Sequence, residues 1–359
     1  MIRFGPAGFQ YKDWEGIVYP TPKPRGFDQL AYLAHYFDTI EINSTFYGPA
    51  RPSTIDSWIR RVEHNPDFRF TAKLHQRFTH QRKATWTQAE VDEVRAGFDP
   101  LLDSGKLGAV LLQFPWSFRR TDENREWLND VVTTFKHYPL VLEVRHSSWN
   151  VPAFYEALGE RGIGFVNIDQ PLFKDSIKPS AVATSHVGYV RVHGRNFKDW
   201  FRENAGRDAR YDYLYPAHEL EPWAERTKEL AREPATDDVY VVTNNHYRGK
   251  AVANALMLQE MVEGTKPGAP PGLLEEYGEV LAPYADPAEP EDALLTLLRG
   301  TPAPAPAPRK SSAAGTSAAK PSAAKPSAAK TAPKLRSQPA AKPSAARPKT
   351  RKPAGRSSE

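Results

Sequence analysis

Short apolar and β-branched runs alternate with segments of helical periodicity between residues 2 and 258. Apolar residues recur three or four positions apart at residues 27–34, 55–62 and 251–258, which is the spacing of an amphipathic helix. Eight strands that alternate with helices in about 250 residues predict an α/β protein with a single closed (β/α)8 barrel of the TIM type. The predicted strands are residues 2–9, 39–46, 68–75, 107–115, 140–146, 162–169, 188–194 and 239–245.

An open, doubly wound sheet is the rival interpretation of this alternation. It would normally have fewer strands and a glycine-rich first turn, and Gly5-Pro6-Ala7-Gly8 lacks the third glycine of the nucleotide-binding fingerprint. Residues 170–187 show no helical pattern, so we expect an irregular connection there. Residues 1–264 would form the barrel domain. Residues 265–300 would form a linker with short peripheral helices at 273–281 and 291–298.

The net charge of +5 over 359 residues averages two unlike segments. Residues 301–359 hold 13 Lys and Arg and one acidic residue, a net charge of +12, so residues 1–300 carry −7. All aromatic residues precede residue 301, and Leu335 is the one large apolar side chain after it. Such a segment buries too little to offset the entropy of ordering, so we expect a disordered, basic, low-complexity tail.

Two absences narrow the class of protein. The chain has no cysteine, which excludes disulfides, thiolate metal sites and a cysteine nucleophile and favours a reducing compartment. It has no apolar run of about 18 residues, and none follows Met1, so we expect neither a membrane span nor a signal peptide. These features predict a cytoplasmic protein without a membrane partner.

Polar side chains crowd the carboxyl ends of the predicted strands, where the active sites of parallel barrels lie. Polar residues two apart, which share a face of a strand, recur on five strands. Buried charge costs several kcal/mol unless it is paired or used. We therefore favour a binding pocket over the alternative, a structural ion-pair layer that plugs the barrel. The strand-end residues are Glu41, Asn43, Lys73, His75, Gln113, Glu143, Arg145, Asn167, Asp169, Arg191, His193, Arg195, Asn244 and Asn245.

Aromatic residues and glycines follow some of these strands. Tyr11 and Trp14 follow the first strand and Tyr47 the second; such rings stack on sugars or bases, or else pack on the barrel rim. Loops after the seventh and eighth strands often bind phosphate in these barrels. Residues 193–196 and 244–250 carry cations and glycines that suit an anion, although helix capping and solvated charge explain them equally well.

A metal site would need carboxylates and imidazoles that converge. Glu41, Glu143, Asp169 and His193 have suitable side chains. No HxH or HExxH spacing supports a metal, and the neighbouring arginines would repel a cation. We therefore expect no metal and no other cofactor.

The order of motifs over residues 1–262 resembles the family of domain of unknown function 72, also called YecE-like. Residues 8–20 (GFQYKDWEGIVYP) are similar to its opening pattern G-[WF]-x-Y-x-x-W-x-G-x-x-Y-P, and residues 41–47 (EINSTFY) to its most specific block. The resemblance implies a TIM-barrel fold and a shared pocket of strand-end residues, but no reaction. Further similar blocks follow in order at residues 68–73 (FRFTAK), 112–115 (LQFP), 143–146 (EVRH), 192–195 (VHGR) and 244–246 (NNH).

The chain departs from the family pattern at two places. Phe9 and Gln10 stand where the family more often has Trp and Ser, and His246 replaces an acidic residue. The second departure weakens any mechanism that needs a carboxylate there. The tail lies outside the resemblance and is similar to the Ala/Lys/Pro-rich tails of linker-histone-like proteins.

We therefore expect an enzyme that acts on a small polar substrate, sugar-like or phosphorylated, by carboxylate acid/base chemistry. Glu41 or Glu143 would be the general acid or base, and Lys73 and His193 would stabilise developing negative charge. Hydrolysis, isomerisation and lyase chemistry all fit this set. The substrate would be bound by Asn43, Tyr47, Gln113, Arg145, Asn167, Asp169, Arg191, Arg195, Asn244, Asn245, Tyr11 and Trp14.

A nucleic-acid-associated or nucleic-acid-processing protein is the alternative. The cations of residues 301–359 would contact phosphates without sequence preference and hold the protein on the nucleoid. The charge of −7 on residues 1–300 argues against broad nucleic-acid contact by the barrel surface. A catalytically silent, ligand-binding barrel is a third class that the sequence leaves open.

Overall fold

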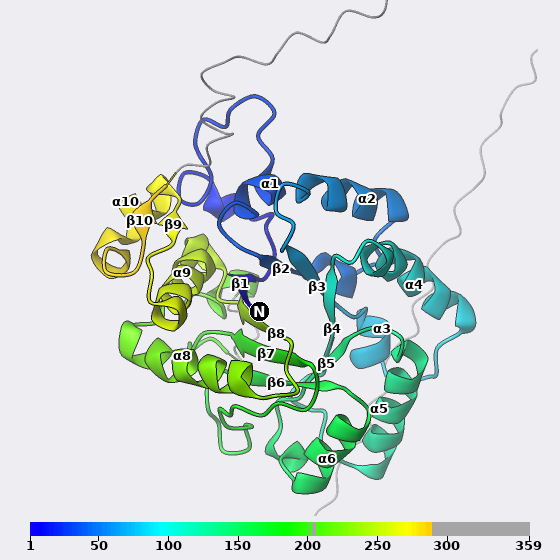
Figure 1. Cartoon of the computed structure of the whole chain (residues 1–359). Helices are drawn as coiled ribbons and strands as arrows, with labels where there is room; N and C mark the ends of the chain where they lie inside the picture. The colour runs from blue at the N-terminus through cyan, green and yellow to red at the C-terminus, as the bar shows by residue number, and fades with distance from the viewer. Residues whose placement is uncertain (201, 203–205, 289–359) are drawn as a thin grey trace, which may run out of the picture. The chain divides into compact units, whose positions relative to one another are not determined.

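The eight apolar runs form eight parallel strands in the computed structural model, which describes residues 1–200, 202 and 206–288 (Figure 1). Most strands end two to four residues before their predicted carboxyl ends, because turns begin at the polar residues there. The strands are β1 (Ile2–Pro6), β2 (Thr39–Ile42), β3 (Arg69–Lys73), β4 (Leu107–Gln113), β5 (Leu140–Glu143), β6 (Gly164–Asp169), β7 (Val187–Val192) and β8 (Asp238–Thr243).

The sheet curls into a barrel. Its strand order is β1-β8-β7-β6-β5-β4-β3-β2, and every pair is parallel. The two outer strands meet at a bridge between Ala7 and Glu41, where the Gly8 amide donates to the Glu41 carbonyl at 2.8 Å. This arrangement confirms the predicted (β/α)8 fold over the doubly wound sheet.

Helices cover the outside of the barrel (Figure 1). Local signals set several of their first residues: Thr87 and Glu90 form a capping box, and Pro52 and Pro152 occupy first-turn positions. The helices are α1 (Gln29–Leu33), α2 (Pro52–Arg61), α3 (Gln76–Thr79), α4 (Gln88–Asp103), α5 (Asp122–Phe135), α6 (Pro152–Glu160), α7 (Gly206–Ala209), α8 (Ala217–Arg232), α9 (Lys250–Glu263) and α10 (Pro271–Leu281).

The connection between β6 and β7 contains no helix, as the sequence predicted. Asn167 ties this irregular segment to the sheet: its Oδ1 accepts from the Ser180 hydroxyl and the Val182 amide, both at 2.8 Å, and its Nδ2 donates to the Val182 carbonyl at 3.0 Å. These bonds replace the contacts that a helix would make with the strand.

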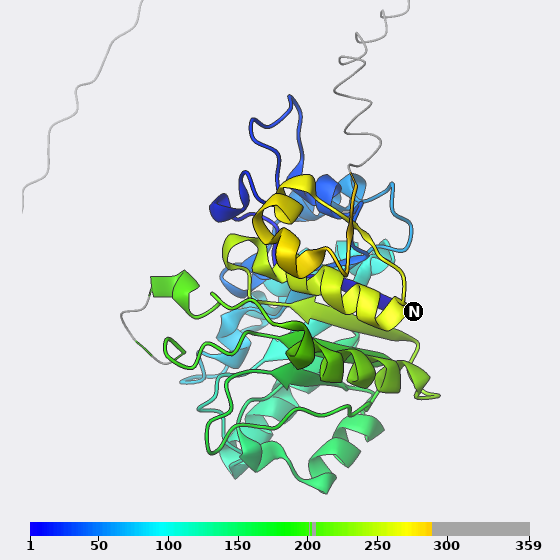
Figure 2. The ribbon, with the colours of Figure 1, turned by 90° about the vertical axis from the view of Figure 1, so that its left-hand side faces the viewer.

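The chain after α9 packs against the barrel domain. The short strands β9 (Gly268–Ala269) and β10 (Asp286–Pro287) pair in parallel, and Leu273 and Leu281 of α10 are buried in the same apolar core as the barrel. Figure 2 shows α10 beside α9. The helix predicted at residues 291–298 and the basic tail lie outside the described residues. In the described part of the chain, no helix is long and apolar enough to cross a membrane.

The strand register decides which polar residues enter the barrel. Arg191 aligns with Ile168 and Tyr189 with Val166, so these residues share the inner face. Asn167 and Asp169 align with Val190 and Val192 on the outer face.

Candidate functional site

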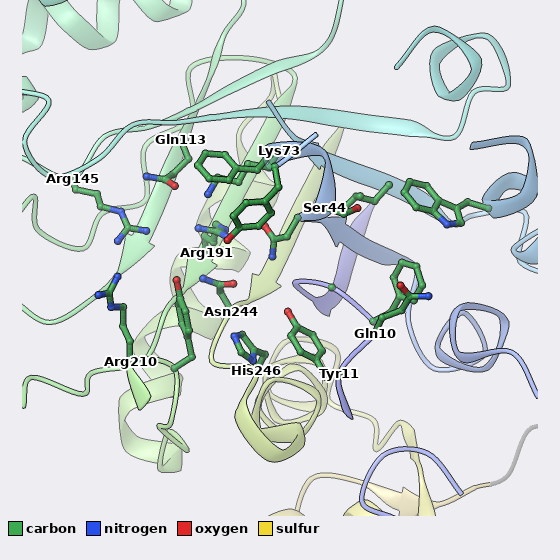
Figure 3. Close-up of a pocket in the computed structure, with 18 of the residues that line it drawn as sticks. Gln10, Tyr11, Ser44, Lys73, Gln113, Arg145, Arg191, Arg210, Asn244 and His246 are labelled. Carbon is green, nitrogen blue, oxygen red and sulfur yellow. The ribbon is translucent and has the colours of Figure 1, made fainter. Parts of the chain in front are cut away.

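A cavity of about 690 Å³ opens at the carboxyl end of the barrel. The N-terminus and α7 lie at opposite ends of the strands in Figure 2, and the cavity is at the end that carries α7. It is lined by Gly8, Phe9, Gln10, Tyr11, Ile42, Asn43, Ser44, Phe46, Tyr47, Trp58, Lys73, Gln113, Arg145, Arg191, Arg202, Arg210, Tyr211, Asn244 and His246 (Figure 3).

Arg191 joins two buried carboxylates beneath this cavity. Its Nη2 and Nε donate to the two oxygens of Glu41 at 2.7 and 2.9 Å, and its Nη1 donates to Glu143 Oε2 at 3.0 Å. The hydroxyl of Tyr189 donates to Glu41 Oε2 at 3.0 Å. Because β2, β5 and β7 are not neighbours in the sheet, these bonds cross the barrel interior.

Arg145 and His193 complete this layer around Glu143. Arg145 Nη2 and Nε lie 2.7 and 2.8 Å from Glu143 Oε1, and His193 Nε2 lies 3.3 Å from the same oxygen. The Asn244 amide nitrogen lies 3.0 Å from His193 Nδ1. Because that nitrogen can only donate, Nδ1 accepts and Nε2 carries the proton of the ring. His193 therefore orients Asn244, which lines the cavity.

The charge states of the layer follow from burial and from its pairing. Burial favours a raised pKa at Glu143, but Arg145, His193 and Arg191 outweigh it and hold that pKa well below its usual range. Burial lowers the pKa of His193 to about 3 despite the attraction of Glu143. At neutral pH, Glu143 is thus a carboxylate and His193 is neutral.

Lys73 is the last residue of β3, and its amine faces the cavity (Figure 3). Its Nζ lies 3.9 Å from the centre of the Phe46 ring and has no hydrogen-bond or ion-pair partner among the described residues. Burial and the nearby Arg191 lower the pKa of this amine to about 7, against the opposing effect of Glu143. A large fraction of Lys73 is therefore neutral at physiological pH.

The described lining residues include five cations and no carboxylate. Figure 3 shows the guanidinium groups of Arg145 and Arg210 turned toward each other across the cavity. Glu41 and Glu143 lie below and make no part of the lining. The lining therefore presents cationic groups to a ligand, and the carboxylates that pair with Arg145 and Arg191 lie beneath it.

One wall of the cavity is aromatic. The rings of Tyr11 and His246 stack with centres 4.4 Å apart and an angle of 12° between planes, and Tyr211 contacts His246 at 4.8 Å. Phe46, which lies beside the Lys73 amine, and Trp58 add apolar surface to the lining. A flat or partly apolar ligand would bury surface against this wall.

The structure brings most of the predicted site residues together, in two levels. The lining of the cavity contains Tyr11, Asn43, Tyr47, Lys73, Gln113, Arg145, Arg191 and Asn244. Glu41, Glu143 and His193 form the layer beneath it with Arg191.

Five predicted residues make other contacts and do not line the cavity. Asp169 faces outward, where Arg195 binds both of its oxygens at 2.8 and 2.9 Å. Trp14 is buried and donates to the His246 carbonyl at 2.7 Å. The remaining two are Asn167, which holds residues 180–182, and Asn245, whose amide donates to Tyr213 and Asn254.

The anion site considered after the seventh and eighth strands is not the cationic region that the structure forms. Arg195 pairs with Asp169, Arg248 pairs with Glu276 at 2.6 Å, and Lys250 pairs with Asp212. The Gly194 amide already donates to the Tyr215 hydroxyl at 2.9 Å. These cations have carboxylate partners on or near the two loops. Among the lining cations of the cavity, Arg145, Arg191 and Arg202 also have carboxylate partners, and Lys73 and Arg210 have none among the described residues.

The four candidate metal ligands do not converge on one point: Glu41, Glu143 and His193 lie in the ion-pair layer, and Asp169 is apart from them. Glu41 and Glu143 are bound by arginines, and Asp169 is on the other face of the sheet. Within residues 1–200, 202 and 206–288, no three His, Asp or Glu side chains gather in a way that would hold a metal ion.

Some lining residues were not among those predicted, notably Arg210, Tyr211, Gln10, Ser44 and Trp58. Arg210 and Tyr211 lie in the connection between β7 and α8, which runs over residues 193–216. Loops at the carboxyl end of a barrel carry many of its site residues, so the long interval between the predicted seventh and eighth strands, residues 195–238, was the available signal.

The fold and this cavity define a (β/α)8 barrel protein with a cationic site above a buried ion-pair layer. The family model described as protein of unknown function DUF72 matches residues 3–274, and the chain belongs to this family. The resemblance found in the motifs is thereby confirmed.

Relatives and solved structures agree with this assignment. The chain is 30% identical over 292 residues to UPF0759 protein YunF of Bacillus subtilis (strain 168), covering 77% of this chain and 100% of YunF. It is 26% identical over 168 residues to UPF0759 protein YecE of Escherichia coli O157:H7, covering 46% of this chain and 58% of YecE. A DUF72 family protein of Thermotoga maritima MSB8 has a solved structure that matches with a TM-score of 0.63 at 32% identity, covering 73% of this chain and 99% of that one.

Proposed function

We propose that this protein is an enzyme that binds a small organic anion in the cavity and uses Lys73 to transfer a proton. The observation that carries the proposal is an unpaired, half-buried amine in a lining that has arginines but no carboxylate among the described residues. Amines with a pKa near the working pH make the most effective general bases.

The proposed roles differ from those expected of a carboxylate mechanism. Glu143 is held ionised by its arginine contacts and does not line the cavity, so it suits the positioning of Arg145 and Arg191 better than proton transfer. The two arginines would stabilise negative charge on the substrate, at fixed positions and without reorganisation. Asn43 and Asn244 would position its polar groups.

Binding and turnover test this function separately. Millimolar inorganic phosphate should raise the melting temperature of the wild type, and Arg210→Met should weaken that effect. Arg125→Met is the matched control, because Arg125 lies on α5 in an exposed pair with Asp122. No effect of phosphate on the wild type would contradict an anion site.

The measurement of turnover uses a panel of phosphorylated and carboxylated metabolites. Lys73→Met should lower kcat by about 10²–10⁴, the usual contribution of general acid–base catalysis. The wild-type rate should rise through about pH 7, because the neutral amine is the active form. Unchanged turnover in Lys73→Met would remove the proposed role of Lys73.

Nucleic-acid binding by the tail is a second proposal, supported by the +12 charge of residues 301–359. The full chain should bind duplex DNA with a steep salt dependence, and a chain of residues 1–300 should not. Filter binding at low and high salt measures the DNA affinity of both chains. Equal binding by both chains would move the nucleic-acid site to the barrel domain.

A further inference from the structure

The approach to the Lys73 amine is open on the cavity side and apolar on the other. Nζ lies against the face of the Phe46 ring at 3.9 Å, and Phe46 lines the same cavity. No carboxylate, carbonyl or amide oxygen binds it among the described residues. The protons of the amine therefore have no hydrogen-bond acceptor among the described residues.

The surroundings of Lys73 leave it without the counter-ion that a purely structural lysine would take. Glu143 and Glu41 are the carboxylates whose charge raises the pKa of Lys73, and guanidinium groups already bind both of them. The ring of His80 packs edge-to-face against Phe46, with centres 4.8 Å apart. Burial and the nearby Lys73 lower the pKa of His80 to about 4, so it adds no charge at neutral pH. An unpaired amine in such a place is suited to bond formation with a substrate.

We propose that Lys73 Nζ forms an imine with a small anion that carries an aldehyde or ketone, such as a 2-oxo acid or a phosphorylated carbonyl compound. This inference rests on the proposed function, since the arginines of the cavity would hold the anionic group. It goes further by naming the reacting bond and the substrate class, and in this reaction Lys73 is the nucleophile, so it is not the general base while the imine exists.

The step balances without an oxidant or a reductant. The neutral amine attacks the carbonyl carbon, a carbon–nitrogen bond forms and the carbonyl π bond breaks. One proton moves from nitrogen to oxygen, and a second is taken from solvent. The oxygen then leaves as water, and a protonated imine remains on Lys73.

The electrostatics of the layer fit this product. A protonated imine carries the same charge as the lysine ammonium, and Glu143 and Glu41 favour a cation at this position. Arg145 and Arg191 oppose a cation there, and a bound anionic substrate offsets their charge. The site would thus favour the imine only when the anion is present.

Reductive trapping tests the proposal on the full chain. Wild-type protein is incubated with glyoxylate or pyridoxal 5′-phosphate at about pH 7.5 and reduced with borohydride, and the modified lysines are quantified by peptide mass spectrometry. Lys83, which is exposed, is the internal reference. The Lys83→Met variant is the matched control for the Lys73→Met variant in the labelling experiment.

We expect the adduct on Lys73 to exceed that on Lys83 by roughly tenfold or more, because an amine with a pKa near 7 is mainly neutral at this pH while an ordinary lysine is not. Excess inorganic phosphate should lower labelling of Lys73 and leave Lys83 unchanged. Lys83→Met should retain the Lys73 adduct. The site of labelling in the wild type decides the question even if Lys73→Met folds poorly.

Equal labelling of Lys73 and Lys83 would overturn the imine. If phosphate still raises the melting temperature in that case, the proposed anion-binding function stands and only the covalent step is lost. Absence of the phosphate effect would instead contradict the proposed function itself, whatever the labelling shows.

Discussion

The two ends of the barrel differ in whether their buried cations have a counter-ion. At the amino end, Arg3 on β1 is 4% exposed and pairs with Asp238 at 2.5 Å, donates to the Asp67 carbonyl at 2.9 Å and lies over the Tyr240 ring. At the carboxyl end, Lys73 faces a cavity, and its amine lies over the Phe46 ring without a hydrogen-bond or ion-pair partner among the described residues. Arg191 lies between these extremes: its Nε, Nη1 and Nη2 donate to Glu41 and Glu143, and the residue also lines the cavity.

This contrast separates stability from function. A guanidinium is charged at all physiological pH values, and one that is paired with a carboxylate of another strand holds the strands together. An amine without a partner destabilises the fold in its charged form, and such a cost is typical of a residue retained for chemistry. The predictions that follow test whether the two ends differ in this way.

Loss of Arg191 should have the largest effect. Arg191→Met leaves Glu41 and Glu143 buried without their shared counter-ion, and we expect the free energy of unfolding to fall by about 3–5 kcal/mol. Urea unfolding followed by circular dichroism measures it. A double variant, Glu41→Gln with Arg191→Met, should recover part of the loss. A change below about 1 kcal/mol would mean that the layer is not a stabilising element.

The pH dependence of stability should report on Lys73. Its pKa is about 7 in the folded protein and about 10.4 when unfolded, so the unfolded chain binds more protons between these values. Stability contributed by this residue is lowest below pH 7 and rises toward pH 10, by about 2 kcal/mol once solvent screening is allowed for. Lys73→Met should flatten this rise in urea titrations, whereas Lys83→Met should not. The same slope in both variants would contradict a shifted amine.

Loss of Arg3 should have the smallest effect of the three. Arg3→Met removes one ion pair to a partly exposed carboxylate and one bond to a carbonyl, so we expect the free energy of unfolding to fall by about 1 kcal/mol. Phosphate binding at the other end of the barrel should stay at the wild-type level, measured by thermal shift. A loss of binding comparable to that in Arg210→Met would show that the two ends are coupled.

The order of strands and the two levels of the site were predictable to different degrees. Alternating apolar runs predicted all eight strands, because a strand buried on both faces needs a continuous apolar sequence. The gathering of Lys73, Arg145 and Arg191 at one end also followed, because parallel strands present their carboxyl ends together. The sequence did not predict that Glu41 and Glu143 are ion-pair partners of Arg191, because that pairing depends on contacts across the barrel.

Asn167 and Asp169 show that the spacing of polar residues predicts a shared face of a strand but not which face it is. Their separation by two residues correctly predicted a common face, but the sequence does not say whether that face is the inner or the outer one. Pairing with Val190 and Val192 places both on the outside. In a strand covered on both sides, the residues of both faces are apolar. The sequence pattern therefore does not show which face points into the barrel.

The chain's local pattern alone determined the barrel, its polar carboxyl end and the separation of an acidic segment from a basic tail, because these depend on periodicity and on counts of charge. The tertiary structure alone decided which cations are paired. Arg191 meets carboxylates from two distant strands, Arg195 meets Asp169, and Lys73 meets an aromatic ring. Strand register and curvature set these distances, and the availability of each charge for a ligand depends on them.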